Sequence, residues 1–155
     1  MLCTVSDEGV YTVNCELYIL NKRNAVMQFV IDTGASITCC RAKELGINFS
    51  EEDFAANKAN VRHMNGVLKE GDSKKHADTY SIKFYEVRLK KFKIGTSIIM
   101  EHVSVWVTFD KRFYTCLLGQ DLLEQIYYLH LKNTQELLVS DRMADLKQYS
   151  VWEII

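Results

Sequence analysis

The sequence contains no proline, no segment of low complexity and no internal repeat. This composition leaves no proline-rich linker at which the 155 residues could be divided. Chains of this length usually form one domain around one hydrophobic core. We therefore expect a single domain that spans residues 1–155.

Cysteines are few, odd in number and never spaced as Cys-x-x-Cys; they are Cys3, Cys15, Cys39, Cys40 and Cys116. Neither a disulfide framework nor a zinc site is therefore indicated. We expect reduced thiols, with Cys39 and Cys40 as small buried apolar side chains, although both could also oxidise. The four histidines show no metal-ligand spacing and no pairing with a nucleophile motif, so we expect no metal and no cofactor. A cysteine peptidase built on Cys39 or Cys40 is possible but has no support in the sequence.

Neither sign of charge is in excess, because 19 basic side chains stand against 20 acidic ones. This balance gives no reason to expect a nucleic-acid partner, and the basic residues between 88 and 93 are typical of a solvated strand face rather than a basic patch. No apolar run reaches the roughly 18 to 20 residues that cross a bilayer, and the N-terminus lacks the pattern of a signal peptide. We therefore expect a soluble, cytoplasmic protein without a membrane partner.

Most of the chain has the β-branched and aromatic pattern of strands. Residues 10–20 and 25–31, separated by a polar stretch, predict a hairpin that leads into Asp32. Asn65-Gly66 is a tight-turn signal and predicts a projecting hairpin over 61–68. Further strands are expected at 80–94, 98–109 and 116–118, a hairpin at 127–131 with 137–139, a helical turn at 41–45, a loop or short helix within 48–60, and a helix at 121–126 after Gly119. The sum is a mostly β domain.

The segment Asp32-Thr33-Gly34-Ala35-Ser36 directly follows the apolar strand that ends at Ile31. A turn at this place could present the Asp32 carboxylate at a defined position. Two adjacent carboxyl groups that share one proton supply both the base that activates water and the acid that protonates the departing nitrogen of a peptide bond. One aspartate cannot do both.

No other aspartate of the chain lies in an Asp-Thr-Gly context, so the second carboxylate must come from another copy. In a two-fold dimer a residue on the axis meets its own symmetry mate. One Asp32 from each subunit would therefore form the pair, and we expect a homodimer. On its own, Asp-Thr-Gly could also be a structural turn of a monomeric scaffold.

These residues resemble the retropepsin-like aspartic peptidases, the single-lobe relatives of the pepsins. Asp32-Thr33-Gly34-Ala35 matches their catalytic signature, and 117–123, Leu-Leu-Gly-Gln-Asp-Leu-Leu, is similar to their second motif of two apolar residues, a glycine and a short helix. The distance between the motifs is longer than in compact viral members and suits cellular or bacterial ones. The resemblance covers about 10–139, leaving 140–155 as a C-terminal extension, a candidate interface strand or packed helix.

The resemblance implies an all-β, closed, barrel-like fold with one short helix after the second motif, assembled as a homodimer. It implies an endopeptidase acting on peptide or protein substrates without a cofactor. The catalytic residues would be Asp32, which holds the lytic water, Thr33, which bonds across the axis, and Gly34, which lets its backbone approach the carboxylate. The alternative is a dimeric peptide- or protein-binding module on the same fold with weak or no turnover.

Substrate-binding positions follow from the same resemblance. They are Ala35 and Ser36 beside the catalytic turn, and Met64, Asn65 and Gly66 in a flexible hairpin, or flap, that closes over the peptide. Any part of 57–76 could supply this flap, and 61–68 could equally be an ordinary surface hairpin. Ala35 lacks the hydroxyl that pepsins carry there and that would favour the ionised carboxylate, so we expect activity to extend toward mildly acidic or neutral pH.

The sequence departs from many viral members at one pair of positions. Those members carry an acid after the alanine and an arginine after the second-motif glycine, whereas this chain has Ser36 and Gln120. Because both charges are missing together, no lone buried charge remains, and a neutral hydrogen bond could replace the ion pair.

Overall fold

The computed structural model describes residues 2–5, 10–19, 24–46, 50–67, 79–131 and 136–142. Within these ranges the backbone is mostly β, with short helical segments. The strands are β1 (Leu2–Val5), β2 (Tyr11–Tyr18), β3 (Ala25–Ile31), β4 (Cys39–Arg41), β5 (Val61–Val67), β6 (Thr79–Ile94), β7 (Ile98–Thr108), β8 (Leu117–Leu118), β9 (Tyr127–Leu131) and β10 (Glu136–Ser140). The helical segments are a 3₁₀ turn, η1 (Ala42–Leu45), and the helices α1 (Glu51–Ala56) and α2 (Gln120–Leu123).

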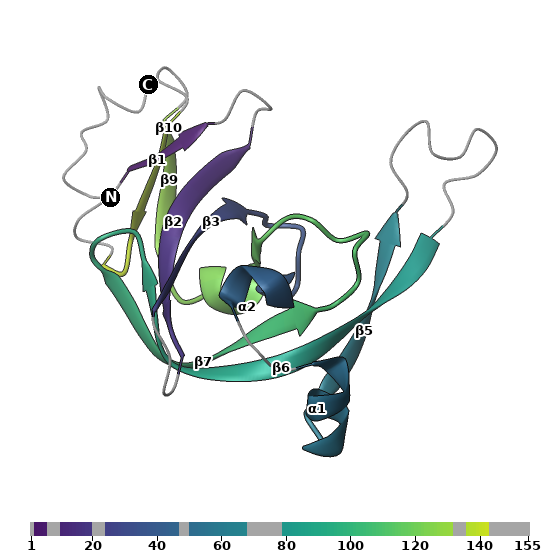
Figure 1. Cartoon of the computed structure of the whole chain (residues 1–155). Helices are drawn as coiled ribbons and strands as arrows, with labels where there is room; N and C mark the ends of the chain where they lie inside the picture. The colour runs from purple at the N-terminus through teal and green to yellow at the C-terminus, as the bar shows by residue number, and fades with distance from the viewer. Residues whose placement is uncertain are drawn as a thin grey trace.

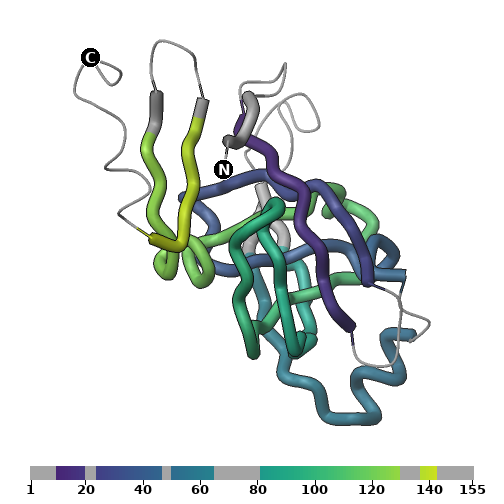
Figure 2. Tube along the Cα trace, turned by 90° about the vertical axis from the view of Figure 1, so that its left-hand side faces the viewer, coloured from purple at the N-terminus to yellow at the C-terminus, as the bar shows by residue number. Residues whose placement is uncertain are grey.

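The described strands form one sheet in the order β5-β6-β7-β4-β8-β3-β2-β1-β10-β9. An additional pairing of β6 with β2 brings the long strand β6 back to the N-terminal hairpin. Figure 1 shows β6 curving beneath the body of the molecule, with the β5–β6 pair projecting from it. Figure 2 shows the β9–β10 hairpin at the end of the molecule opposite α1.

The N-terminal hairpin that leads into Asp32 is confirmed. β2 and β3 pair antiparallel from Thr12 opposite Val30 to Leu17 opposite Ala25. The inward residues Met27 and Phe29 of β3 are buried, whereas Val26 and Gln28, which alternate with them, are exposed. This period of two buries one face of the strand and fixes its register.

The main core lies between this hairpin and the β6–β7 pair. Phe29 of β3 meets Phe92 of β6 edge to face, with the ring centroids 5.6 Å apart, and both rings are fully buried. A second, smaller cluster joins β4, β6 and β7; its buried members are Ile37, Cys39, Ile82, Phe84 and Trp106, and Met64, Phe113 and Leu117 pack against it. We call this second group the site-side cluster.

The helical segments agree with the local signals. Gly46 ends η1 with φ 64°, a left-handed conformation that glycine adopts without steric cost. Ser50 and Asp53 form a capping box that begins α1, inside the stretch expected to be a loop or short helix. α2 follows Gly119 as predicted, although it is shorter than expected. α1 is a second short helix beside the one expected after the second motif.

The prediction of a turn at Asn65-Gly66 was wrong. β5 continues through both residues, and its antiparallel pairing with β6 runs from Val61 opposite Tyr85 to Val67 opposite Thr79. Hydrogen bonding to a neighbouring strand outweighs the local preference of Asn-Gly for a turn, because a turn here would leave the facing backbone groups of β6 unpaired. The reversal between β5 and β6 lies outside the described residues, as does most of the C-terminal extension.

In the described part of the chain, no helix is long and apolar enough to cross a membrane. The division into a core at 10–139 and an extension at 140–155 stays a prediction.

The Phe29 ring tests the assignment of the core. Phe29→Ala removes a fully buried ring from its contact with Phe92 and should lower the free energy of unfolding by about 3 to 5 kcal/mol, measured by urea denaturation. Val26→Thr on the exposed face of the same strand is the control and should change it by less than about 0.5 kcal/mol. Equal effects of the two substitutions would contradict this packing.

Candidate active site

Asp32 is the first residue after β3, and its backbone is held by β8. β3 and β8 run parallel, with Val30 beside Leu117 and Ile31 beside Leu118. The Asp32 N–H donates to the Leu118 carbonyl at 3.0 Å. The start of the Asp32 turn is therefore fixed by the second sequence motif, far away in the chain.

The turn itself folds around the Asp32 carboxylate. The Gly34 N–H donates to Asp32 Oδ1 at 2.9 Å, and the Ala35 N–H donates to the Asp32 carbonyl at 3.2 Å. A Cβ added to Gly34 would lie 3.3 Å from Asp32 Oδ1, so a side chain there would crowd the carboxylate. Asp32 is half-buried, while Thr33 and Gly34 are exposed, so the turn presents its acid at the surface.

Gln120 holds the same turn from the second motif. Its backbone N–H donates to the Ala35 carbonyl at 2.8 Å, and its side-chain Nε2 donates to the Thr33 carbonyl at 3.0 Å. A neutral hydrogen bond from Gln120 is thus present, as the sequence predicted, but its acceptor is the Thr33 backbone. The Ser36 side chain is exposed.

Thr38 and Asp121 tie the two motifs together beneath the turn. The buried Thr38 hydroxyl donates to Asp121 Oδ1 at 2.7 Å and accepts the Gly119 N–H at 3.1 Å. The Thr38 N–H donates to Asp121 Oδ2 at 3.1 Å, and the Leu122 N–H donates to Asp121 Oδ1 at 2.8 Å. A carboxylate in the first turn of α2 also suits the positive end of the helix dipole.

Gly119 is required by close packing of two backbones. A Cβ at this position would lie 2.3 Å from the Ile37 carbonyl oxygen, a distance at which the backbone would have to move. The apolar-apolar-Gly pattern of the second motif therefore has a steric cause. β8 can lie beside the segment that follows the Asp32 turn only if the residue directly after β8, Gly119, has no side chain.

A shallow depression lies next to the turn. Its volume is about 430 Å³, and it is lined by Thr33, Gly34, Ala35, Ser36, Gln120, Asp121 and Glu124. Both sequence motifs contribute to it, and most of its lining is exposed. The two motifs that the sequence pairs are thus neighbours in space and share one open face.

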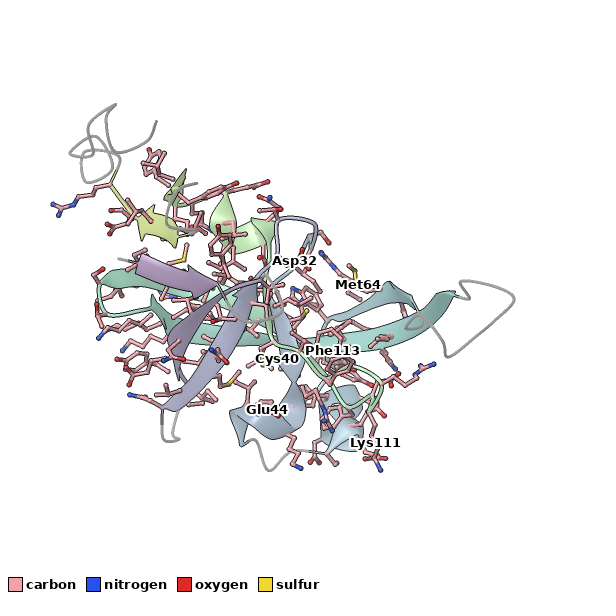
Figure 3. All side chains as sticks on the ribbon, turned by 90° about the horizontal axis from the view of Figure 1, so that it is seen from above. Asp32, Cys40, Glu44, Met64, Lys111 and Phe113 are labelled. Carbon is pink, nitrogen blue, oxygen red and sulfur yellow. The ribbon has the colours of Figure 1, made fainter. Side chains whose placement is uncertain are left out.

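Of the expected flap residues, Met64 is placed near this region. Met64 is half-buried against the site-side cluster, to which Ile37 after the turn and Leu117 of β8 also belong. Figure 3 labels Met64, Phe113 and Asp32. Asn65 and Gly66 continue β5 beyond Met64, and only their backbone pairing is described. The substrate-binding role of these residues stays a prediction.

Sequence reasoning did not identify Thr38 or Asp121 as parts of the site, or Phe113 as a residue that packs against the site-side cluster. Asp121 lies within the second motif, and Thr38 follows Asp32 closely in the sequence, but nothing local indicates that their side chains meet. Phe113 lies in the segment between β7 and β8 and packs edge to face on Phe84, with centroids 5.3 Å apart. An aromatic residue in an unpatterned segment gives no signal of such a contact.

The alternative of a cysteine peptidase lacks a suitable nucleophile. Cys39 and Cys40 are buried, as predicted. Burial raises the pKa of Cys39 to about 12, and a hydrogen bond to Cys116, together with burial, raises the pKa of Cys40. Both thiols are therefore protonated near neutral pH, whereas the thiolate is the nucleophile. Among the described residues, no group of three or more His, Cys, Asp or Glu could hold a metal ion.

Comparison with known proteins agrees with this geometry. No family model and no curated protein sequence matches the chain. Among solved structures, the chain is similar to a retropepsin-like aspartic protease from Rickettsia conorii, with a TM-score of 0.56 and 18% sequence identity over 90% of this chain and 88% of that one. The chain has the retropepsin-like fold. At this identity the likeness establishes the fold alone, and the retropepsin-like fold explains why the two motifs meet.

The Thr38 hydroxyl tests how the motifs are joined. Thr38→Val keeps the shape but leaves the Gly119 N–H without its partner and removes one of the two hydrogen bonds to Asp121 Oδ1, and should cost about 2 to 4 kcal/mol of unfolding free energy in urea denaturation. Thr38→Ser keeps the hydroxyl and loses one methyl group, so it should cost about 1 kcal/mol. If the serine variant is as unstable as the valine variant, the hydroxyl does not have this role.

Proposed function

We propose that this protein is an aspartic endopeptidase that hydrolyses peptide bonds at a site formed by two Asp32 carboxylates, one from each subunit of a homodimer. The observation that carries the proposal is the Asp32 turn on a retropepsin-like fold. Its carboxylate is held by the Gly34 N–H at 2.9 Å, its backbone is held by β8, and the turn is exposed.

The need for two copies follows from the sequence. Asp-Thr-Gly occurs once in the 155 residues, so one chain supplies one such carboxylate. A two-fold axis beside Asp32 would bring the second carboxylate to the first. The exposed Thr33 and Gly34 leave the turn accessible to a second copy, and the depression beside it offers further contact area.

The chemistry would proceed by water attack without a covalent intermediate. Two carboxyl groups that meet at a two-fold axis cannot both ionise, so the pair shares one proton. The ionised member takes a proton from a water molecule, and the oxygen of that water attacks the scissile carbonyl carbon. The protonated member gives its proton to the departing nitrogen, which leaves as an amine.

The substrate would lie between the Asp32 turns and the β5–β6 hairpins. Ala35 and Ser36 lie beside the turn, and Met64, Asn65 and Gly66 lie on β5, which projects from the body of the molecule (Figure 1).

The finer fold assignment, a closed barrel, is supported by the pairing of β6 with β2, which links the first and last strands of the run β6-β7-β4-β8-β3-β2. Location in the cytoplasm stays a prediction.

Asp32→Asn tests the catalytic assignment. An amide cannot take a proton from water, so cleavage of a peptide library, followed by mass spectrometry, should fall at least about a thousandfold. Asp141→Asn makes the same change at an exposed position after β10 and should leave the cleavage rate unchanged.

The outcomes separate the two candidate functions. Unchanged cleavage by Asp32→Asn would contradict the catalytic role of Asp32. If neither form cleaves any peptide but both bind peptides with equal affinity, the chain is a binding module on this fold. Circular dichroism of each variant shows whether the fold is retained.

Mixing the wild type with Asp32→Asn tests the shared site. If each site needs one carboxylate from each chain, random reassociation with an equal amount of the variant should reduce the activity of a fixed amount of wild type to about half. A site contained in one chain would instead keep its full activity. Sedimentation at the assay concentration, which should give the mass of a dimer, is the companion measurement.

A further inference from the structure

Cys40 lies on β4, and Cys116 is the residue directly before the neighbouring strand β8. β4 pairs antiparallel with β8, with Cys39 opposite Leu117. One step further along this register, Cys40 faces Cys116, the residue before β8, and the two thiols are hydrogen-bonded. Facing residues of antiparallel strands have Cα atoms about 4.5 to 5.5 Å apart, within the range of about 4.4 to 6.8 Å that disulfides span.

The two thiols differ in their access to solvent. Cys40 is fully buried in the main core. Cys116 is half-buried and lines an open cavity of about 430 Å³, together with Val26, Gln28, Val30 and Glu44. Cys116 lines this cavity and Cys40 does not, so a small molecule in the cavity contacts Cys116 rather than Cys40.

The two thiols also differ in acidity. The Cys40 thiol donates a hydrogen bond to Cys116, which lowers the pKa of Cys116, although burial and the Glu44 carboxylate act in the opposite direction. The pKa of Cys40 is raised by the same bond and by burial. Cys116 is therefore the better nucleophile of the pair, since the thiolate is the reactive form.

We propose that Cys116 and Cys40 form a peroxide-sensitive thiol pair, in which Cys116 is the site of oxidation and Cys40 closes a disulfide with it. The Cys116 thiolate attacks one peroxide oxygen, the O–O bond breaks, and hydroxide leaves and is protonated to water. The resulting sulfenic acid is then attacked by the Cys40 sulfur. The S–O bond breaks, the S–S bond forms, and the hydroxyl leaves with the Cys40 proton as a second water.

The cross-link would lie at the base of the candidate active site. The Cys116 carbonyl accepts the N–H of Val30, two residues before Asp32, at 2.8 Å, and Cys40 is two residues after Thr38. The disulfide would therefore join β4, the strand that follows the Asp32 turn, to the segment before β8, which is hydrogen-bonded to β3. The proposal concerns thiol chemistry and holds whether or not the protein cleaves peptides.

Peptide mapping after oxidation tests the pair. The reduced full-length chain is treated with hydrogen peroxide, alkylated and digested with trypsin without reduction. The wild type should yield peptide 24–41 joined to peptide 113–132, with the mass of a disulfide. Cys40→Ser and Cys116→Ser should both lose this product, and Cys40→Ser should keep a sulfenic acid on Cys116 that a dimedone probe traps.

Cys39→Ser is the matched control, because Cys39 is also buried but belongs to the site-side cluster rather than the main core. It should keep the cross-link. Loss of the cross-link in Cys39→Ser, its persistence in Cys40→Ser, or an unmodified Cys116 in the oxidised wild type would each overturn the proposal.

A second measurement needs no variant and so does not depend on how any variant folds. In the native, reduced wild type, iodoacetamide should label Cys116 at least about tenfold faster than Cys39, because burial keeps Cys39 protonated. Equal labelling rates would overturn the assignment of Cys116 as the reactive thiol.

Discussion

A single buried hydroxyl, that of Thr38, joins the two segments that carry the sequence motifs. It bonds Gly119 and Asp121 at once, and Asp121 also accepts the backbone N–H groups of Thr38 and Leu122. With both oxygens satisfied, the Asp121 carboxylate can be held in the partly buried interior at low cost. Every other feature of the site rests on the strand alignment that these bonds maintain.

That alignment explains why the Asp32 turn has a defined shape. β8 lies between β3 and β4, the two strands on either side of the turn, and Gly119 allows the backbones to approach. Gln120 then donates hydrogen bonds to two carbonyl groups of the turn, one from its backbone N–H and one from its side chain. A short segment that contains an acid, a hydroxyl and a glycine is thus held by partners from a distant part of the chain, which leaves its outer face open for a second copy.

The same strand arrangement also produces the thiol pair. Pairing Cys39 with Leu117 brings the next residues, Cys40 and Cys116, face to face. Cys40 is enclosed in the main core, whereas the half-buried Cys116 packs against that core and also lines a cavity. The candidate catalytic turn and the candidate redox pair are therefore consequences of one set of strand contacts.

Local patterns in the sequence were sufficient for several parts of the structure. The β2–β3 hairpin, the end of β3 at Asp32, the turn closed by Gly46 and the helix after Gly119 all depend on periodicity or on residues next to one another in the chain. Asn65-Gly66 shows the limit of this reasoning, because its turn preference is local and the pairing with β6 that overrides it is not.

The sequence by itself determined a mostly β chain with one Asp-Thr-Gly turn and a matching second motif. Only the tertiary structure decided that Thr38 bonds Gly119 and Asp121, that Gln120 bonds the Thr33 carbonyl, and that Cys40 faces Cys116. The first three of these contacts join residues 81, 83 and 87 positions apart. Such pairs leave no mark on local periodicity, because their geometry exists only once the strands between them have taken their places in the sheet.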